Sequence, residues 1–259
     1  MNVLVLGATS VIGAHVAEAF AHGNDLLLTG RDANRLRQAG ARCRAAGASS
    51  VIEAEFDLRQ GLAGLDAAPS EWTPDVIVNA ASSTSRLRDD AIPAGDLSSA
   101  VAVDLLAPLD LIRSLAGRRC GRQTRVVFIS SVLAAVPSPR RLIYGSLKRI
   151  HEEALAALAR SEPGVTVLIA RLAKVISPDY PSRDAARFAS AVRRSFDEGK
   201  VNMSFGVSGR LMTGLFLLQP AVFHLAVKSI RIVRQWHRPT QPDLIENIST
   251  VRSEATGTF

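Results

Sequence analysis

The chain is poor in cysteine, aromatic residues and lysine. Its 259 residues include two cysteines, two tyrosines and two tryptophans, and aromatic residues make up 5% of the total. Cys43 and Cys120 are too few for a disulfide framework and lack metal-type spacing, so we expect a reducing, cytoplasmic setting. No basic segment precedes the first apolar run and no Ala-x-Ala cleavage motif follows it, so we expect no secretion.

Acidic residues are fewer than basic ones, 24 against 31, which gives a formal net charge of +7; four of the basic residues are lysines. Genome composition would explain this arginine bias, and so would binding of phosphate groups or attraction to an anionic membrane surface. No nucleic acid partner is expected, because aromatic residues are few and the arginines are scattered. The five histidines are not spaced as metal ligands, so no metal site is expected.

Apolar residues are abundant, at 47% of the chain, which is enough for one large domain with a sizeable core. Short apolar segments alternate with segments of helical periodicity, including a long helix expected at 97–116. The expected strands are residues 3–6, 26–29, 51–56, 75–78, 126–129, 165–170 and 201–205. This alternation predicts an α/β fold over residues 1–205: a Rossmann-type, doubly wound parallel sheet of about seven strands with helices on both faces.

Glycine or polar residues end several of these strands. They are Gly7, Gly30, Asp57, Asn79 and Ser131. Ligands of such sheets bind at the carboxyl ends of the strands, so these residues should converge on one crevice. The first of them opens a glycine-containing turn between a strand and a helix, where backbone N–H groups attract phosphate.

Tyr144 and Lys148 are spaced i and i+4 in a segment of helical periodicity, so their side chains leave one face about 6 Å apart along the axis. An ammonium favours the phenolate, so we expect Lys148 to lower the pKa of Tyr144 from its usual value of about 10. Such a tyrosine can exchange a proton with an alcohol or carbonyl oxygen, which Ser131 could hold. The alternative is a surface helix on which this spacing arose by chance.

In this order, these segments resemble the short-chain dehydrogenase/reductase family over about residues 1–205. The family's motifs are matched by Leu6-Gly7-Ala8-Thr9-Ser10-Val11-Ile12-Gly13, by Asp57-Leu58, by Asn79-Ala80-Ala81, by Ser131 and by Tyr144-x-x-x-Lys148. The resemblance implies an NAD(P)-dependent oxidoreductase that acts on ketones or secondary alcohols, and a homo-oligomer.

The resemblance also implies roles for these residues. Tyr144 would be the general acid or base, Ser131 would orient the carbonyl, and Lys148 would hydrogen-bond the nicotinamide ribose. The implied cofactor-binding residues are Gly7, Thr9, Ser10, Val11, Ile12, Gly13, Asp57, Leu58, Asn79, Ala80, Ala81, Tyr144, Lys148 and Val175.

Three positions depart from the family pattern. Val11 replaces the middle glycine of the first motif and narrows the turn that approaches the phosphates. Asp104 replaces the asparagine that completes the catalytic tetrad; it either holds the relay water, with its charge favouring the Lys148 cation, or is a solvated helix residue. Leu172-Ala173 replaces the Pro-Gly that precedes Val175, the expected contact of the nicotinamide carboxamide.

The end of the second strand bears on the choice of cofactor. NAD-preferring proteins place an acidic residue there to bind the ribose 2′-hydroxyl. This chain has Gly30 and then Arg31, whose guanidinium can pair with a 2′-phosphate. Asp32 is expected to cap the following helix, so the sequence favours NADP over NAD.

The C-terminal part does not follow the common ending of the family. Residues 206–238 form an apolar and then basic arm, with apolar residues dominating 211–227 and Lys, Arg and Trp following, and residues 239–259 form a polar tail. The apolar part is short for a membrane span and suits a segment that lies in the membrane interface, at the inner face of the membrane. The alternative is that 211–238 packs on the protein itself or on a partner subunit.

A similar arm occurs in membrane-associated short-chain reductases of bacterial envelope synthesis, such as the reductase of decaprenylphosphoryl-2-keto-pentose. This likeness makes a lipid-linked keto-sugar the leading substrate, with another small or lipidic ketone as the alternative. A non-catalytic NADP-binding sensor is disfavoured because such proteins usually lose the tyrosine or the lysine. An epimerase or dehydratase of sugar nucleotides is disfavoured because those enzymes usually carry a larger substrate domain.

Overall fold

The computed structural model describes residues 1–60, 72–83, 96–117, 123–136, 138–173, 182–206 and 214. The chain separates into two compact units, Met1–Phe216 and Leu217–Phe259, and the described residues all belong to the first. Val175, most of the arm at 206–238 and the whole tail at 239–259 lie outside the described residues. The predictions made for them stay predictions.

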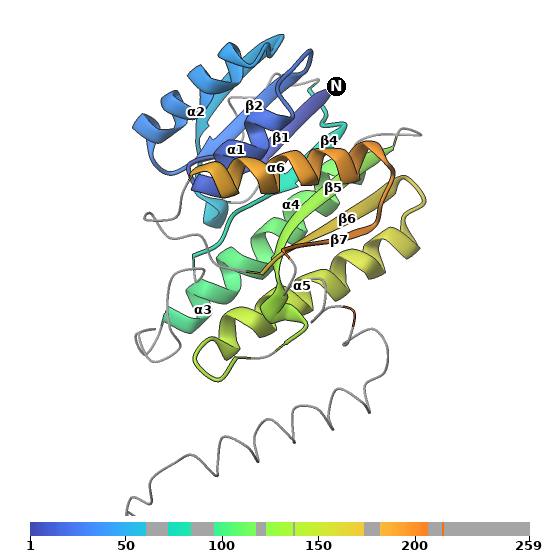
Figure 1. Ribbon diagram of the computed structural model, residues 1–259. Coiled ribbons are helices and arrows are strands. Elements are labelled where there is room, and N and C mark those ends of the chain that lie inside the picture. Colours follow the sequence, from blue (N-terminus) through green and yellow to red (C-terminus); the bar gives the residue numbers. More distant parts are fainter. Residues whose placement is uncertain are drawn as a thin grey trace, which may run out of the picture. The chain divides into compact units, whose positions relative to one another are not determined.

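The described residues form a seven-stranded sheet in which every neighbouring pair is parallel, with the order β3-β2-β1-β4-β5-β6-β7 (Figure 1). The strands are β1 (Asn2–Leu6), β2 (Asp25–Gly30), β3 (Ser50–Glu55), β4 (Val76–Asn79), β5 (Thr124–Ser131), β6 (Val165–Leu172) and β7 (Asn202–Phe205). The predicted Rossmann-type fold is therefore confirmed.

Helices cover both faces of this sheet. They are α1 (Val11–Ala19), α2 (Ala33–Ala45), α3 (Asp96–Val101), α4 (Ala107–Gly117), α5 (Leu142–Ser161) and α6 (Ser182–Asp197), with a π-helix η3 (Ala102–Leu106) and a 3₁₀ turn η4 (Val132–Ala134). Side chains of α1, α2 and α6 pack into one core on one face, and those of α4 and α5 pack into a second core on the other. Asp32 caps α2 as predicted, accepting a hydrogen bond of 3.0 Å from the Arg35 N–H.

The strands are apolar without interruption because each is buried on both faces. Val3 and Val5 belong to the first core, whereas Leu4 and Leu6 belong to the second. Successive side chains of a strand point to opposite faces, so an alternating pattern would have left one face polar. Apolar runs of this kind thus specify a sheet enclosed between two helical layers.

The strand order reverses next to β1. The chain adds β2 and β3 on one side of β1 and β4 to β7 on the other. The crossovers therefore diverge above the carboxyl ends of β1 and β4 and leave room for a ligand there. The residues predicted to converge on a crevice lie at or just after the carboxyl ends of their strands.

The long helix predicted at 97–116 is interrupted. Residues 102–106 wind as a π-helix between α3 and α4, and Asp104 lies inside this segment. A π-helical turn adds a residue without changing the apolar character of the helix face, so periodicity does not reveal it. Such bulges are frequent at functional sites.

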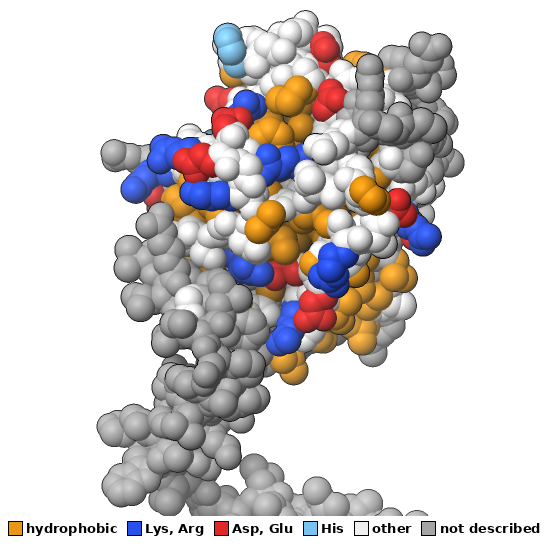
Figure 2. Space-filling model, turned by 90° about the vertical axis from the view of Figure 1, so that its right-hand side faces the viewer, with side chains coloured by type: hydrophobic (Ala, Val, Ile, Leu, Met, Phe, Trp, Pro, Cys, Tyr) orange, Lys and Arg blue, Asp and Glu red, His pale blue; other side chains and the backbone are white. Residues whose placement is uncertain are grey.

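No helix of the described part of the chain is long and apolar enough to cross a membrane. On the face of the molecule seen in Figure 2, basic and acidic side chains lie among exposed apolar ones. Exposed apolar side chains of the described residues include Leu106, Leu142 and Ile150, which belong to η3 and α5.

Candidate active site

A tight turn joins β1 to α1 at the carboxyl end of the sheet. Gly7 has a φ of +81°, and a Cβ atom there would lie 2.8 Å from the Cα of Ala81, so only glycine fits. Ser10 caps α1: its hydroxyl donates to the Gly7 carbonyl and accepts from the Gly13 N–H, both at 2.9 Å. The N-terminal end of α1, with its partial positive charge, therefore lies directly at this turn.

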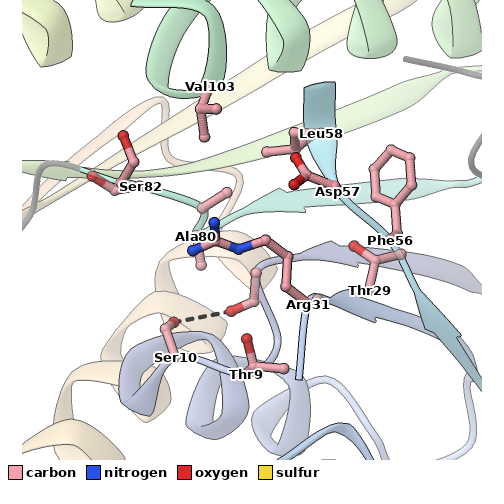
Figure 3. Close-up of a pocket in the computed structure, with 14 residues that line it drawn as sticks. Thr9, Ser10, Thr29, Arg31, Phe56, Asp57, Leu58, Ala80, Ser82 and Val103 are labelled. Carbon is pink, nitrogen blue, oxygen red and sulfur yellow. Dashed lines mark hydrogen bonds between the residues drawn. The ribbon is translucent and has the colours of Figure 1, made fainter. Parts of the chain in front are cut away.

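A pocket opens beside the turn, lined by residues that follow β1, β2, β3 and β4. The lining residues are Gly7, Thr9, Ser10, Thr29, Gly30, Arg31, Phe56, Asp57, Leu58, Ala80, Ala81, Ser82, Ser83 and Val103. Figure 3 shows the Arg31 side chain extended across this pocket. The pocket thus combines a helix N-terminus with an arginine, as a site for a dinucleotide phosphate requires.

Asp57 lies at the far side of the pocket and forms an ion pair with Arg59, at 2.5 Å between Oδ2 and the nearest guanidinium nitrogen. Hydrogen bonding from Arg59 outweighs partial burial and lowers the pKa of Asp57 to about 2, with Arg31 adding a smaller effect. The carboxylate is therefore ionised and able to accept a hydrogen bond from a ligand amine.

The structure brings most predicted cofactor residues together. Gly7, Thr9, Ser10, Arg31, Asp57, Leu58, Ala80 and Ala81 line the pocket. Val11, Ile12 and Gly13 instead begin helix α1. Asn79 is buried at the end of β4, where its Oδ1 accepts from the Ala81 N–H at 3.2 Å. Asn79 therefore shapes the turn that meets Gly7.

Sequence reasoning missed several lining residues, among them Thr29, Phe56, Ser82, Ser83 and Val103. Thr29 and Phe56 adjoin predicted strand ends, so their position alone could have indicated them. The two serines lie in a segment with no periodic pattern, and Val103 belongs to the unpredicted π-helix.

Three of the predicted catalytic residues are buried side chains at or near the carboxyl end of β5. Ser131 is the last residue of β5, while Tyr144 and Lys148 lie one turn apart on α5. Their exposed fractions are 4%, 7% and 3%. The Ser131 hydroxyl lies close enough to the Tyr144 phenol to lower its pKa, so the two hydroxyl groups are neighbours.

Gly145 determines how closely α5 approaches this strand end. A Cβ atom at Gly145 would lie 2.7 Å from the carbonyl oxygen of Leu133 in η4, the turn that directly follows Ser131. Any side chain at position 145 would push α5 away from η4. Glycine here therefore permits the contact between Tyr144 and Ser131.

The expectation that Lys148 lowers the pKa of Tyr144 is wrong for this structure. Burial raises the pKa of Tyr144 to about 12, against smaller lowering effects of Arg141 and of the hydrogen bond with Ser131, and Asp104 raises it further. The Nζ atom of Lys148 lies 5.9 Å from the ring centroid of Tyr144 and donates instead to the Ile129 carbonyl at 3.0 Å. Helical spacing alone did not reveal that β5 holds the ammonium.

Lys148 is itself shifted by its surroundings. Burial lowers its pKa to about 8, although the charges of Asp104 and Glu152 act in the opposite direction. Its Nζ atom also lies 4.6 Å from the ring centroid of Phe128, a favourable position for a cation. The predicted effect of Asp104 on the lysine charge is present but smaller than the effect of burial.

Asp104 is 3% exposed, so the alternative that it is a solvated helix residue is wrong. Its carboxylate accepts hydrogen bonds from the Ser82 hydroxyl, at 3.0 Å, and from the Ser83 N–H. Its carbonyl oxygen is 3.0 Å from Nδ1 of His151. Asp104 therefore fixes two pocket-lining serines to the π-helix.

The described part of the chain holds no group of three His, Cys, Asp or Glu side chains arranged to bind a metal ion. It does fit a nicotinamide dinucleotide. The glycine turn at Gly7, the N-terminus of α1 and Arg31 suit its phosphates, and Asp57 suits an adenine amine.

Comparisons with known proteins agree with this geometry. A family model described as short chain dehydrogenase matches residues 1–173. An uncharacterised oxidoreductase of Mycobacterium tuberculosis is 33% identical over 215 residues, which cover 76% of this chain and 85% of that protein.

Solved structures share the fold. A short-chain dehydrogenase from Streptomyces avermitilis has a TM-score of 0.70 at 22% identity, covering 92% of this chain and 99% of that one. A short-chain dehydrogenase from Sphingobium yanoikuyae, solved in complex with NADPH, has a TM-score of 0.65 at 22% identity, covering 93% and 98% of the two chains.

Proposed function

Because the chain belongs to the short-chain dehydrogenase/reductase family and is an NAD(P)-dependent oxidoreductase, we propose that it reduces a ketone with Tyr144 as the proton donor. The observation that carries this proposal is the pairing of the buried Tyr144 and Ser131 at the carboxyl end of β5, which adjoins β4, the strand whose following residues line a pocket suited to a dinucleotide. The bound nicotinamide supplies the hydride, and the residues of this chain supply the proton and the orientation.

Ser131 and Tyr144 act on the same substrate oxygen. The Ser131 hydroxyl donates a hydrogen bond to the carbonyl oxygen and orients it towards the phenol. Burial keeps Tyr144 protonated at neutral pH, since its pKa is raised to about 12, so it acts as an acid when negative charge develops on that oxygen. Lys148, held by the Ile129 carbonyl, uses its other N–H donors on the nicotinamide ribose.

The test is the oxidation of NADPH, followed against a panel of ketones that includes lipid-linked keto-sugars. Tyr144→Phe should lower the rate by about 10²–10⁴-fold, because the proton donor is lost. Binding of NADPH, measured by fluorescence, should persist in this variant. A variant as active as the parent would refute the assignment of Tyr144, and NADPH binding with no activity on any ketone would favour the sensor alternative.

We propose NADP as the preferred cofactor, on the strength of Arg31. It directly follows β2, whose last residue is Gly30 instead of the acidic residue that binds a ribose 2′-hydroxyl, and it reaches across the pocket. That a structural neighbour was solved with NADPH supports this preference.

Arg31→Gln should weaken NADPH binding about tenfold or more and leave NADH binding nearly unchanged, because a charged contact to a phosphate is lost. Arg37→Gln, on the exposed side of α2, is the matched control and should change neither. Equal or tighter binding of NADH by the parent chain would overturn the preference.

We propose a lipid-linked keto-sugar as the substrate class, with the protein placed at the cytoplasmic face of the membrane. The support is the apolar and basic sequence of the arm at 206–238, which suits the membrane interface. We also propose self-association, supported by the exposed Leu106, Leu142 and Ile150; sedimentation of the full chain tests it.

A further inference from the structure

Arg141 lies beside the phenol of Tyr144. It is the N-cap residue of α5, three positions before the tyrosine, and its side chain makes no capping hydrogen bond. Arg141 directly precedes the first turn of α5, which contains Tyr144, so its long side chain can reach the ring. Its Cζ atom lies 4.5 Å from the centroid of the Tyr144 ring.

Arg141 and Lys148 are unequal in their relation to the phenol. The Arg141 guanidinium is at 4.5 Å from the ring centroid, whereas the Lys148 ammonium is at 5.9 Å and hydrogen-bonded to Ile129 of β5. An opposite charge favours the ionised form of an acid more strongly the closer it lies, and Arg141 is the cation that lowers the pKa of Tyr144. The arginine is therefore placed to do what the sequence suggested for the lysine.

Charged and polar groups from other elements also act on this phenol. Asp104 of η3 disfavours the phenolate, and Ser131 of β5 favours it through a hydrogen bond. Arg141 is the larger of the two favourable influences, although burial outweighs both. A phenolate formed at this buried position thus depends on a cation that compensates for lost hydration.

We propose that Arg141 is a positioning residue that acts through Tyr144, its guanidinium stabilising the phenolate formed in the reaction. This inference rests on the proposed function. The O–H bond of Tyr144 breaks, its proton passes to the substrate oxygen that has become negative through hydride addition at carbon, and the electron pair stays on the tyrosine oxygen. Arg141 lies next to the ring that takes up this charge.

The test measures ionisation of Tyr144 in the full-length protein, without any substrate. The chain has two tyrosines, so Tyr180→Phe leaves Tyr144 alone, and growth on 3-fluorotyrosine places one ¹⁹F label there. A fluorinated phenol ionises at lower pH than a phenol, which brings its titration into a milder range. The ¹⁹F shift is followed against pH in the Tyr180→Phe background and in three further variants.

Arg141→Gln should raise the titration midpoint by about one pH unit or more, because an opposite charge at this distance is lost. Arg141→Lys should keep the midpoint close to that of the Tyr180→Phe protein, because lysine retains the positive charge. Arg140→Gln, which removes an equal charge from the exposed neighbouring residue, should leave the midpoint in place. Arg141→Met, which keeps the aliphatic stem, repeats the measurement if the glutamine variant does not fold.

Equal midpoints in the Arg141→Gln and Arg140→Gln proteins would overturn the proposal. Because this titration needs no turnover, its result is independent of whether a ketone substrate has been found. Where a substrate is known, alcohol oxidation by Arg141→Gln should fall about tenfold at pH 7 and recover when the pH is raised by about one unit. Loss that does not recover at higher pH would indicate a structural role instead.

Discussion

At the scale of single residues, His151 couples the catalytic helix to the π-helix. It is fully buried, stacks on Phe128 with ring centroids 4.2 Å apart, and its Nδ1 lies 3.0 Å from the Asp104 carbonyl. A carbonyl only accepts hydrogen bonds, so Nδ1 carries the hydrogen and Nε2 is an acceptor, which has no partner among the described residues.

Protonation of His151 should therefore destabilise the fold. Burial lowers its pKa to about 4, from 6.5 in an unfolded chain. Between these values the unfolded chain binds a proton that the native protein does not, so this contribution to stability is complete above pH 6.5 and declines towards pH 4. The decline should reach about 3 kcal/mol at most.

Urea unfolding between pH 7.5 and 4.5 measures this effect. His151→Phe keeps a ring against Phe128 and removes the titrating group, so its stability should depend less steeply on pH in this window. A slope equal to that of the parent chain would show that other groups dominate acid unfolding.

For single residues, the sequence predicted positions better than it predicted pKa values. The positions of Ser131, Tyr144 and Gly7 followed from strand ends and helical spacing. The sign of the shift in the Tyr144 pKa did not, because it depends on burial and on the direction of the Lys148 side chain. Neither property is encoded in spacing along one helix.

At the scale of elements, a buried ion pair fastens α5 to the sheet. Glu152 of α5 accepts hydrogen bonds from Arg171 of β6, at 2.5–3.1 Å, and from the Ser130 hydroxyl of β5, at 2.5 Å. The side chains of the ion pair are only 13% and 10% exposed. The pair therefore ties the helix that carries Tyr144 to two strands.

Arg171→Met should destabilise the protein by about 3–5 kcal/mol, because it leaves the Glu152 carboxylate buried without its cation. The double variant Glu152→Leu/Arg171→Met should be markedly more stable than the single one, since no charge remains buried. Urea unfolding of the three proteins measures both differences. If the free energy of unfolding of Arg171→Met lay within about 1 kcal/mol of that of the parent, the ion pair would contribute little to stability.

Elements differed in how well the sequence predicted them. The predicted strands lie within one or two residues of the observed ones, because apolar runs and their polar ends set both boundaries. The π-helix at 102–106 was missed: Val101, Leu105, Leu109 and Ile112 repeat at ordinary helical intervals. The burial of Asp104 depends on tertiary contacts with Ser82 and Ser83, which lie in an aperiodic segment.

At the scale of the whole molecule, the proposed membrane contact depends on the basic end of the arm. A basic residue near an anionic surface contributes about 1 kcal/mol, so three substitutions should weaken binding about 100-fold. We expect this loss for the full-length variant Lys228→Gln/Arg231→Gln/Arg234→Gln in flotation with vesicles rich in phosphatidylglycerol.

The matched control is Arg37→Gln/Arg113→Gln/Arg160→Gln, which removes the same charge from exposed positions on α2, α4 and α5. It should bind vesicles nearly as the parent does. Equal losses of vesicle binding in the two triple variants would show that binding depends on the net charge of the protein and not on the arm. No loss in either variant would remove the support for an interfacial arm.

The close contact of Gly145 with the Leu133 carbonyl has an evolutionary consequence. The distance between the proton donor and the serine is set by one missing methyl group against a main-chain oxygen, which no side-chain change at Leu133 can alter. A chain that evolves away from glycine at position 145 must therefore move α5 relative to η4, because the clash is with a main-chain oxygen.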